Sequence, residues 1–232
     1  MTHHTQTIVA LDFDTREELF QLLDAFQTPI YVKLGMEAIY SFGTTIIEEI
    51  KSRGHRIFLD LKLHDIPNTV YHAMKQLAHL NVDMINVHAG GGIEMTAAAA
   101  KAVKEVNPNM ICIAVTILTS LDEETVRDEM WIDKPLREVA LHYARNAKIA
   151  GLDGVVCSVH EVSDIHALCG EDFLTVTPGI ALADTKANDQ KRVATPLEAK
   201  QLGSDYIVVG RAITKSKDPV QTYQKIQEDL IK

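Results

Sequence analysis

The sequence predicts an α/β protein folded as a single-domain (β/α)8 barrel, the TIM-barrel architecture, over residues 1–232. Eight short runs rich in β-branched residues recur along the chain, and segments with helical spacing of apolar residues separate them. Eight such units fit a small closed barrel, which typically has about 250 residues, better than an open sheet. The chain contains no linker or low-complexity segment, so we expect one domain.

The expected strands are apolar on both faces, as parallel strands between helices are. They comprise residues 7–13, 30–34, 56–62, 82–88, 110–117, 152–157, 173–177 and 206–210. Apolar residues with helical spacing follow the first strand at Leu19, Leu22, Leu23 and Phe26. The pattern is therefore a strand and a helix in alternation.

Composition limits the classes of partner. The 23 Lys and Arg residues are outnumbered by 32 Asp and Glu, and the net charge of -9 argues against a surface that binds a nucleic-acid backbone. Three widely spaced cysteines, Cys112, Cys157 and Cys169, favour neither a disulfide framework nor a zinc site. We find no signal-peptide pattern and no run of roughly 20 apolar residues that could span a membrane. We expect a cytoplasmic protein that binds small molecules, without nucleic-acid or membrane partners.

Polar residues gather where the expected strands end, which is where barrel enzymes carry their active sites. These positions hold Asp12, Lys33, Asp60, Lys62, Asn86, His88, Thr116, Thr119, Gly210 and Arg211. In the third strand, period-two alternation puts Asp60 and Lys62 on one face, opposite three leucines. One interpretation is a buried ion pair in which the two charges only neutralise each other and have no role in function. Because charges inside a barrel are costly and such pairs stabilise weakly, we interpret the pair as functional.

Two nearby features keep more than one interpretation. Asp65 lies just before Pro67, so it fits either a helix start or a role in catalysis. His64 and His88 suggest metal binding, but no H-E-x-x-H motif or comparable set of ligands accompanies them. We therefore expect no metal site.

The last two expected strands predict a phosphate site. Pro178 and Gly179 follow the seventh strand, and Gly210 and Arg211 come at the end of the eighth. Loops at these two places in a barrel often bind phosphate through backbone N–H groups, and an arginine adds a two-pronged donor. The alternative is that Gly210 only forms a tight turn and Arg211 is a solvated charge.

Several motifs together resemble the bacterial orotidine 5'-phosphate decarboxylase family over essentially the whole chain. They are Asp60-x-Lys62-x-x-Asp65-Ile-Pro-Asn-Thr, Val9-Ala-Leu-Asp12-Phe, Tyr31-Val-Lys33, Thr177-Pro-Gly-Ile and Val208-Val-Gly210-Arg211. The resemblance implies decarboxylation of orotidine 5'-phosphate to uridine 5'-phosphate (UMP) and CO2, the last step of de novo pyrimidine biosynthesis. It also implies a homodimer whose active sites are shared across the interface.

The resemblance implies a role for each matching residue of the reacting end. Asp12 and Lys33 match positions that hold the ribose hydroxyls. Asp60 matches the carboxylate between two lysines, and Lys62 matches the lysine that delivers a proton to C6 of the pyrimidine.

Further matches concern the base and the dimer. Thr119 matches a position that contacts the base, and Pro178 matches a wall beside it. Asp65, Ile66 and Thr69 match positions that one subunit contributes to the site of the other. A monomer would then be an incomplete enzyme.

The resemblance implies that Gln190, Gly210 and Arg211 bind the phosphate. One position departs from the family, because most bacterial members have an arginine where this chain has Ala181. Loss of a charge-assisted hydrogen bond to phosphate would weaken binding by roughly 1.5–3 kcal/mol. We expect weaker phosphate binding, while the lysine and aspartate residues of the reacting end remain in place.

Decarboxylation normally needs an electron sink, and the sequence carries no cofactor motif, so we expect no cofactor. A fixed ammonium at Lys62 would instead stabilise the negative charge that develops on C6. Two alternatives are a metal-assisted lyase or epimerase acting on sugar phosphates, and a nucleotide-binding protein without turnover, which Ala181 makes conceivable.

Overall fold

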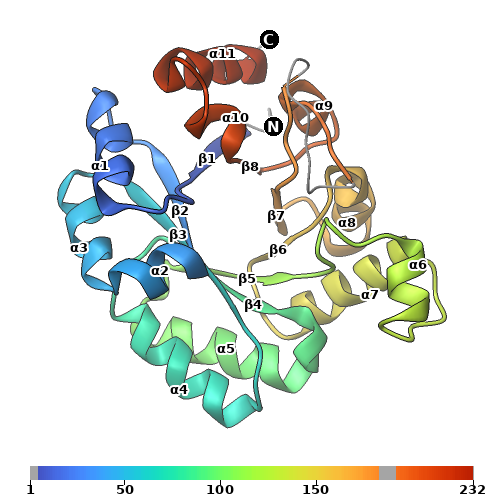
Figure 1. Ribbon diagram of the computed structural model, residues 1–232. Coiled ribbons are helices and arrows are strands. Elements are labelled where there is room, and N and C mark those ends of the chain that lie inside the picture. The colour runs from blue at the N-terminus through green and yellow to red at the C-terminus, as the bar shows by residue number, and fades with distance from the viewer. Residues whose placement is uncertain (1–4, 183–191, 232) are drawn as a thin grey trace.

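The computed structural model describes residues 5–182 and 192–231, and in these residues eight parallel strands close into a barrel in chain order. The strands are β1 Gln6–Ala10, β2 Tyr31–Gly35, β3 Arg56–Leu63, β4 Met84–His88, β5 Ile111–Val115, β6 Gly154–Val156, β7 Leu174–Thr177 and β8 Tyr206–Val209. Pairing of β1 with β8 closes the ring. The helices surround the strands, as Figure 1 shows, and the predicted barrel is confirmed.

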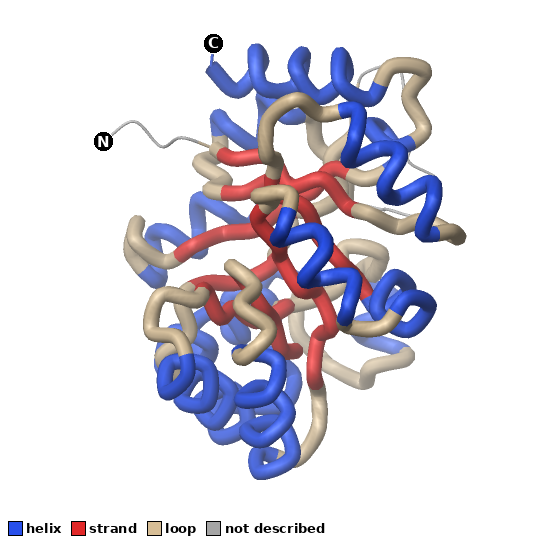
Figure 2. Tube along the Cα trace, turned by 90° about the vertical axis from the view of Figure 1, so that its left-hand side faces the viewer, coloured by secondary structure: helices blue, strands red, loops and turns tan. Residues whose placement is uncertain are grey.

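The helices follow the strands in the chain and cover the outside of the barrel (Figures 1 and 2). They are α1 Arg16–Ala25, α2 Met36–Phe42, α3 Thr45–Ser52, α4 Pro67–Ala78, α5 Gly92–Val106, α6 Glu123–Asp128, α7 Leu136–Ile149, α8 Val162–Cys169, α9 Pro196–Gln201, α10 Arg211–Thr214 and α11 Pro219–Ile231. Within the described residues, none of these helices has the length and apolar character to span a membrane.

Each predicted strand is present, with shifted ends. The first strand ends at Ala10 rather than at residue 13, so Asp12 lies in the loop that follows. The pairing of β1 with β2 extends to Ala10, which lies opposite Lys33. Leu11 adds one hydrogen bond, from its N–H to the Lys33 carbonyl, at 3.0 Å. Asp12 is thereby placed above the strand end, where its side chain is exposed.

Alternating residues build two apolar layers. Ile8 and Ala10 point into the barrel, and Val9 and Leu11 pack with the surrounding helices. The barrel interior is filled by Ile8, Ala10, Tyr31, Phe58, Met84, Ile113, Val115, Val156, Val176, Tyr206 and Val208. The barrel is therefore a packed core, and a binding site must lie at one of its ends.

A carboxylate clamp recurs at the N-terminal ends of the strands. Asp83, Asp153 and Asp205 each directly precede a strand, and each accepts a backbone N–H from the strand before it, at 2.7, 2.7 and 2.8 Å. Each carboxylate also pairs with a basic side chain from a helix. The partners are Lys51 at 2.9 Å, Lys104 at 2.9 Å and His166 at 3.4 Å.

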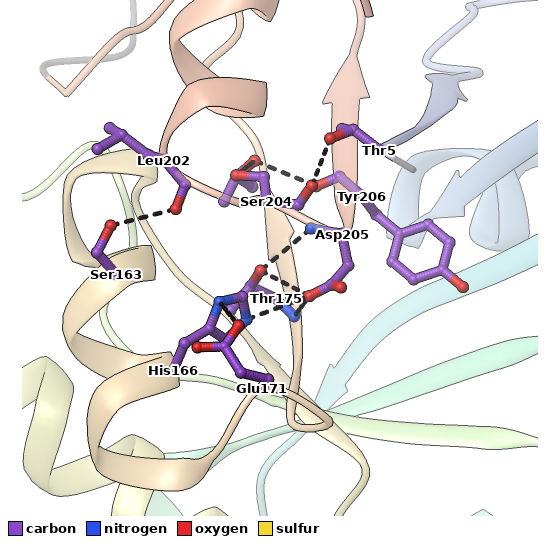
Figure 3. A network of polar contacts seen from close by, with 10 residues as sticks. Thr5, Ser163, His166, Glu171, Thr175, Leu202, Ser204, Asp205 and Tyr206 are labelled. Atoms are coloured by element: carbon purple, nitrogen blue, oxygen red, sulfur yellow. Dashed lines mark hydrogen bonds and ion pairs between the residues drawn. The ribbon is translucent and has the colours of Figure 1, made fainter. Parts of the chain in front are cut away.

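The third clamp differs because its basic residue is a histidine, the side chain whose ordinary pKa lies nearest neutral pH (Figure 3). The hydrogen bond to Asp205 raises the pKa of His166 against the opposing effect of burial. Burial alone would raise the pKa of Asp205, but the His166 and Thr175 hydrogen bonds outweigh it and lower that pKa. Thr175 Oγ1 also donates to the Asp205 carboxylate, at 2.9 Å.

The His166 clamp should make stability depend on pH. A raised pKa of His166 contributes stability that is complete below its unfolded value of about 6.5 and is lost as pH rises through the folded value. The lowered pKa of Asp205 adds stability above about pH 3.9 that is lost as pH falls through its folded value. We expect His166→Gln to destabilise the protein by roughly 1.5 kcal/mol near pH 6 and by less near pH 9, in urea unfolding.

Lys104→Gln is the matched control, since it removes the basic partner of the equivalent clamp at Asp153. Its effect should be the same at both pH values. An equal effect of His166→Gln at both would show that the pair does not titrate as its surroundings indicate.

Candidate active site

A cleft of about 1070 Å³ lies at the C-terminal ends of the strands. Most of the residues singled out in the sequence line it. They are Asp12, Lys33, Asp60, Lys62, Thr119, Pro178, Gly210 and Arg211, and Ala181 lines it as well. The prediction that strand-end residues from distant parts of the chain come together is therefore confirmed for these positions.

Four charged side chains form an alternating array in this cleft. Lys33 Nζ lies 3.3 Å from Asp12 Oδ1 and 3.4 Å from Asp60 Oδ2. Lys62 Nζ lies 2.7 Å from the other oxygen of Asp60, Oδ1. Asp12 comes from the loop after β1, Lys33 from β2, and both Asp60 and Lys62 from β3.

Asp60 is the buried member of the array, with 7% of its surface exposed. Burial alone would raise the pKa of its carboxyl, but Lys33, Lys62 and the hydrogen bond from Asn86 outweigh burial and hold that pKa below its ordinary value. Asp60 is therefore ionised at neutral pH, and it fixes two ammonium groups at the bottom of the cleft.

The strand carrying this pair is not regular. Leu59 pairs with Ile85 and Leu63 pairs with Val87. Between these two pairs β3 advances by four residues but β4 by only two, so β3 contains a bulge. Within this bulge, Lys62 adopts a φ of 53°, in the left-handed region that non-glycine residues rarely occupy. The contact between Asp60 and Lys62 confirms the prediction that they share a face. The contact forms across a bulge, whereas the prediction assumed a regular strand.

Asn86 holds the bulge from the neighbouring strand. Its side-chain oxygen accepts the backbone N–H of Lys62 at 2.8 Å, and its side-chain nitrogen donates to Asp60 Oδ1 at 2.7 Å. The sequence placed Asn86 at a strand end and gave it no role. A polar residue with no exposed surface is the signal that could have been used, but only the structure shows that burial.

Asp65, Ile66 and Thr69 are not among the described residues that line the cleft. All three are exposed, and Ile66 leaves 65% of its surface in solvent. The helix-start interpretation of Asp65 fits only in part. Helix α4 begins at Pro67 as expected, but Ile66 takes the N-cap position without a side-chain cap, and Asp65 accepts the N–H of Ile66, at 2.6 Å.

The part of the cleft beside β8 carries basic and hydroxyl groups. Gly210 directly precedes α10, and Arg211, Lys215, Ser216 and Thr222 line the cleft beside it. The two hydroxyl groups of Ser216 and Thr222 are hydrogen-bonded at 2.6 Å. Gln190, which was predicted to contact phosphate, lies outside the described residues.

The segment around Ala181 is tied at its base. Ile180 pairs with Ala194, the Ala181 N–H donates to the Ala194 carbonyl at 3.0 Å, and the Ala194 N–H donates to the Gly179 carbonyl at 3.1 Å. These bonds fix the position of Ala181 at the rim of the cleft.

A buried ion pair that the sequence did not predict supports this base. Arg192 contacts Glu161, a carboxylate with 2% of its surface exposed, and Glu161 also accepts the Ser158 N–H at 2.9 Å. Burial raises the pKa of Glu161 despite the nearby guanidinium of Arg192. Residues 31 positions apart form this pair, so no local pattern reveals it.

His64 and His88 stack at 5.4 Å between ring centroids. Burial lowers the pKa of His88, and the neighbouring His64 and Lys62 lower it further. His88 Nδ1 accepts the Gly90 N–H at 3.1 Å. Among the described residues, no three His, Cys, Asp or Glu side chains are grouped as a metal site would need.

Comparison with known proteins gives the family. The model of the orotidine 5'-phosphate decarboxylase / HUMPS family matches residues 5–226. Orotidine 5'-phosphate decarboxylase of Geobacillus sp. (strain WCH70) is 52% identical over 227 residues, which cover 96% of this chain and 95% of that protein. The enzyme of the same name from Bacillus anthracis is 52% identical over 226 residues, with 95% of each chain covered.

A solved structure agrees with these relatives. The crystal structure of orotidine 5'-phosphate decarboxylase from Lactobacillus acidophilus matches with a TM-score of 0.87 and 41% identity, covering 97% of this chain and 99% of that one. The matched region contains both the charged array and the strand ends that form the cleft. This chain belongs to the orotidine 5'-phosphate decarboxylase / HUMPS family.

Proposed function

We propose that this protein decarboxylates orotidine 5'-phosphate to UMP and CO2, the last step of UMP biosynthesis. The observation that carries the proposal is the array of alternating charges in one cleft, formed by Asp12, Lys33, Asp60 and Lys62. Relatives that cover nearly the whole chain are named for the same reaction.

Lys62 supplies the chemistry of the reacting carbon. When the bond from C6 to the carboxylate breaks, its electron pair stays on C6 and CO2 departs. The ammonium of Lys62 stabilises this charge more strongly in the transition state than in the substrate, where the charge lies on the carboxylate. An N–H bond of Lys62 then breaks as its proton bonds to C6, and the neutral amine regains a proton from water.

The other members of the array hold the substrate and the lysine. Ionised Asp60 fixes the ammonium of Lys62 at 2.7 Å, which limits its motion before substrate binds. Asp12 and Lys33 bind the ribose hydroxyls, for which a carboxylate and an ammonium are complementary acceptor and donor groups.

The rest of the cleft accommodates the two ends of a nucleotide. Thr119 and Pro178 lie beside the base, and Gly210 and Arg211 bind the phosphate through a backbone N–H and a guanidinium. Gln190 completes the phosphate grip. Ala181, where the family resemblance implies an arginine, leaves phosphate binding weaker.

We further propose a homodimer that shares its active sites. Asp65, Ile66 and Thr69 are exposed and lie off the cleft of their own subunit, so they are free to reach the cleft of a second copy.

Free, buried thiols at Cys112, Cys157 and Cys169 suit the reducing cytoplasm, where we place the protein.

Lys62→Ala should reduce kcat at least about 10³-fold, because it removes both the charge stabilisation and the proton donor. UMP should still bind, since the phosphate contacts remain. Turnover is followed as the loss of absorbance when orotidine 5'-phosphate becomes UMP, with EDTA present so that a metal-dependent sugar-phosphate enzyme would be inactive.

Lys51→Ala is the matched control, because Lys51 forms an ion pair of 2.9 Å at the other end of the barrel. It should leave kcat unchanged. Near-normal turnover of Lys62→Ala would contradict the assignment, and UMP binding by a wild-type protein without turnover would favour the nucleotide-binding alternative.

Ala181→Arg should raise kcat/KM for orotidine 5'-phosphate by about ten- to a hundredfold, the effect of one added charge-assisted hydrogen bond. Guanidinium ion added to the wild-type protein should raise its rate and leave the variant unaffected. Orotidine, which lacks the phosphate, is the control substrate, and its slow turnover should be equal in both proteins. An equal gain for orotidine would show that Ala181 does not act through phosphate.

Mixing two inactive variants tests the shared site. If Asp65 serves the cleft of the partner subunit, a hybrid dimer of Lys62→Ala and Asp65→Ala contains one intact site and one doubly impaired site. Random exchange of subunits should then restore about a quarter of the wild-type activity. If both residues act within one subunit, mixing should restore nothing.

A further inference from the structure

Asn86 links the two charged residues of β3 although it belongs to β4. Its amide nitrogen donates to the Asp60 carboxylate at 2.7 Å, and its amide oxygen accepts the backbone N–H of Lys62 at 2.8 Å. No part of Asn86 is exposed to solvent. Asn86 therefore contacts both members of the pair from beneath the cleft, without lining the described cleft itself.

The bulge in β3 explains why this contact is needed. The pairing of β3 with β4 is interrupted between Leu59 and Leu63, and a side chain, that of Asn86, accepts the Lys62 N–H within the gap. A buried N–H without an acceptor is strongly unfavourable. The Asn86 side chain thus stabilises the left-handed conformation of Lys62, whose φ is 53°.

A primary amide of this length performs both tasks at every pH. It offers a donor to the carboxylate and an acceptor to the N–H at the same time. A leucine of similar shape offers neither, and an aspartate would place a second carboxylate against Asp60. Asparagine at position 86 therefore matches the chemistry of both partners without depending on protonation.

The geometry gives Asn86 two ways of placing the ammonium of Lys62. The backbone conformation of Lys62 sets the direction in which its side chain leaves β3. The Asp60 oxygen that accepts from Asn86 is also the one 2.7 Å from Lys62 Nζ. We propose that Asn86 is a positioning residue for the reaction, which fixes Lys62 and Asp60 relative to each other; this rests on the proposed decarboxylation.

The test compares Asn86→Leu and Asn86→Asp with the wild type, using kcat, KM, UMP affinity and the pH profile. Asn86→Leu should lower kcat about 10- to 100-fold, the effect of losing a hydrogen bond to a charged group, with a smaller change in UMP affinity. The acidic limb of the pH profile of Asn86→Leu should move to higher pH, because Asp60 loses its hydrogen-bond donor from β4. Asp60 keeps its contacts with Lys33 of β2 and Lys62 of β3, and Asp12 keeps its contact with Lys33.

Asn86→Asp separates positioning from packing. The introduced carboxyl group, when protonated, can still donate to Asp60, so two carboxyl groups share one proton and activity should fall as pH rises and that proton is lost. Val87→Ala is the matched control, since Val87 is the next residue on β4, is fully buried and packs toward the helices. It should lower the melting temperature without changing kcat or the pH profile.

Titration of the Asp60 carboxyl by ¹³C NMR keeps this test separate from the proposed function. Its pKa should rise in Asn86→Leu relative to wild type and Val87→Ala, whatever the substrate. Wild-type protein without turnover would refute the decarboxylation, while this titration would still decide the placement of Asp60. Unchanged kcat, pH profile and titration in the asparagine variants would overturn the inference, and Asn86→Asp decides it if Asn86→Leu does not fold.

Discussion

Asp60 is an ionised carboxylate buried inside a barrel, and much of the surrounding architecture follows from the free-energy cost of that burial. Such a charge is tolerated only where cations and hydrogen-bond donors surround it. The donors come from three neighbouring strands, as Lys33 of β2, Lys62 of β3 and Asn86 of β4. Parallel pairing in strict chain order is what brings these side chains to one carboxylate. The same contacts place two ammonium groups in the cleft before any substrate arrives.

The two ends of the barrel use carboxylates in opposite ways. At the N-terminal ends, Asp83, Asp153 and Asp205 each receive a backbone N–H and a basic side chain, so their bonding capacity is spent within the fold. At the C-terminal ends, Asp12 keeps 51% of its side chain exposed while it contacts Lys33. The three N-terminal carboxylates are thus bonded within the fold, whereas Asp12 at the other end remains accessible to a ligand.

The positions of the strands could be predicted because each is a short apolar run that no other element explains, and a closed barrel then dictates that Asp12, Lys33 and Arg211 meet. The bulge could not be predicted, because Asp60-x-Lys62 has the spacing of a regular strand. The roles of Asn86 and of the Glu161 and Arg192 pair depend on burial and on contacts between distant residues. Asp65 lies off the cleft of its own subunit, as the proposed sharing of sites between two copies requires of it.

The bulge itself argues that β3 is shaped for the placement of Lys62 rather than for stability. In an unbroken strand, residues two apart already share a face and lie about 6.5 Å from each other, so a regular β3 would also have put Asp60 and Lys62 on the cleft side. A left-handed lysine and an interrupted ladder are both unfavourable, and the fold compensates them with a buried asparagine side chain. What the irregular strand adds is a different direction for the lysine side chain, with its ammonium held against Asp60. Strain stored at this residue is consistent with an ammonium that must be fixed before negative charge develops beside it, because a preorganised charge need not reorient during the reaction.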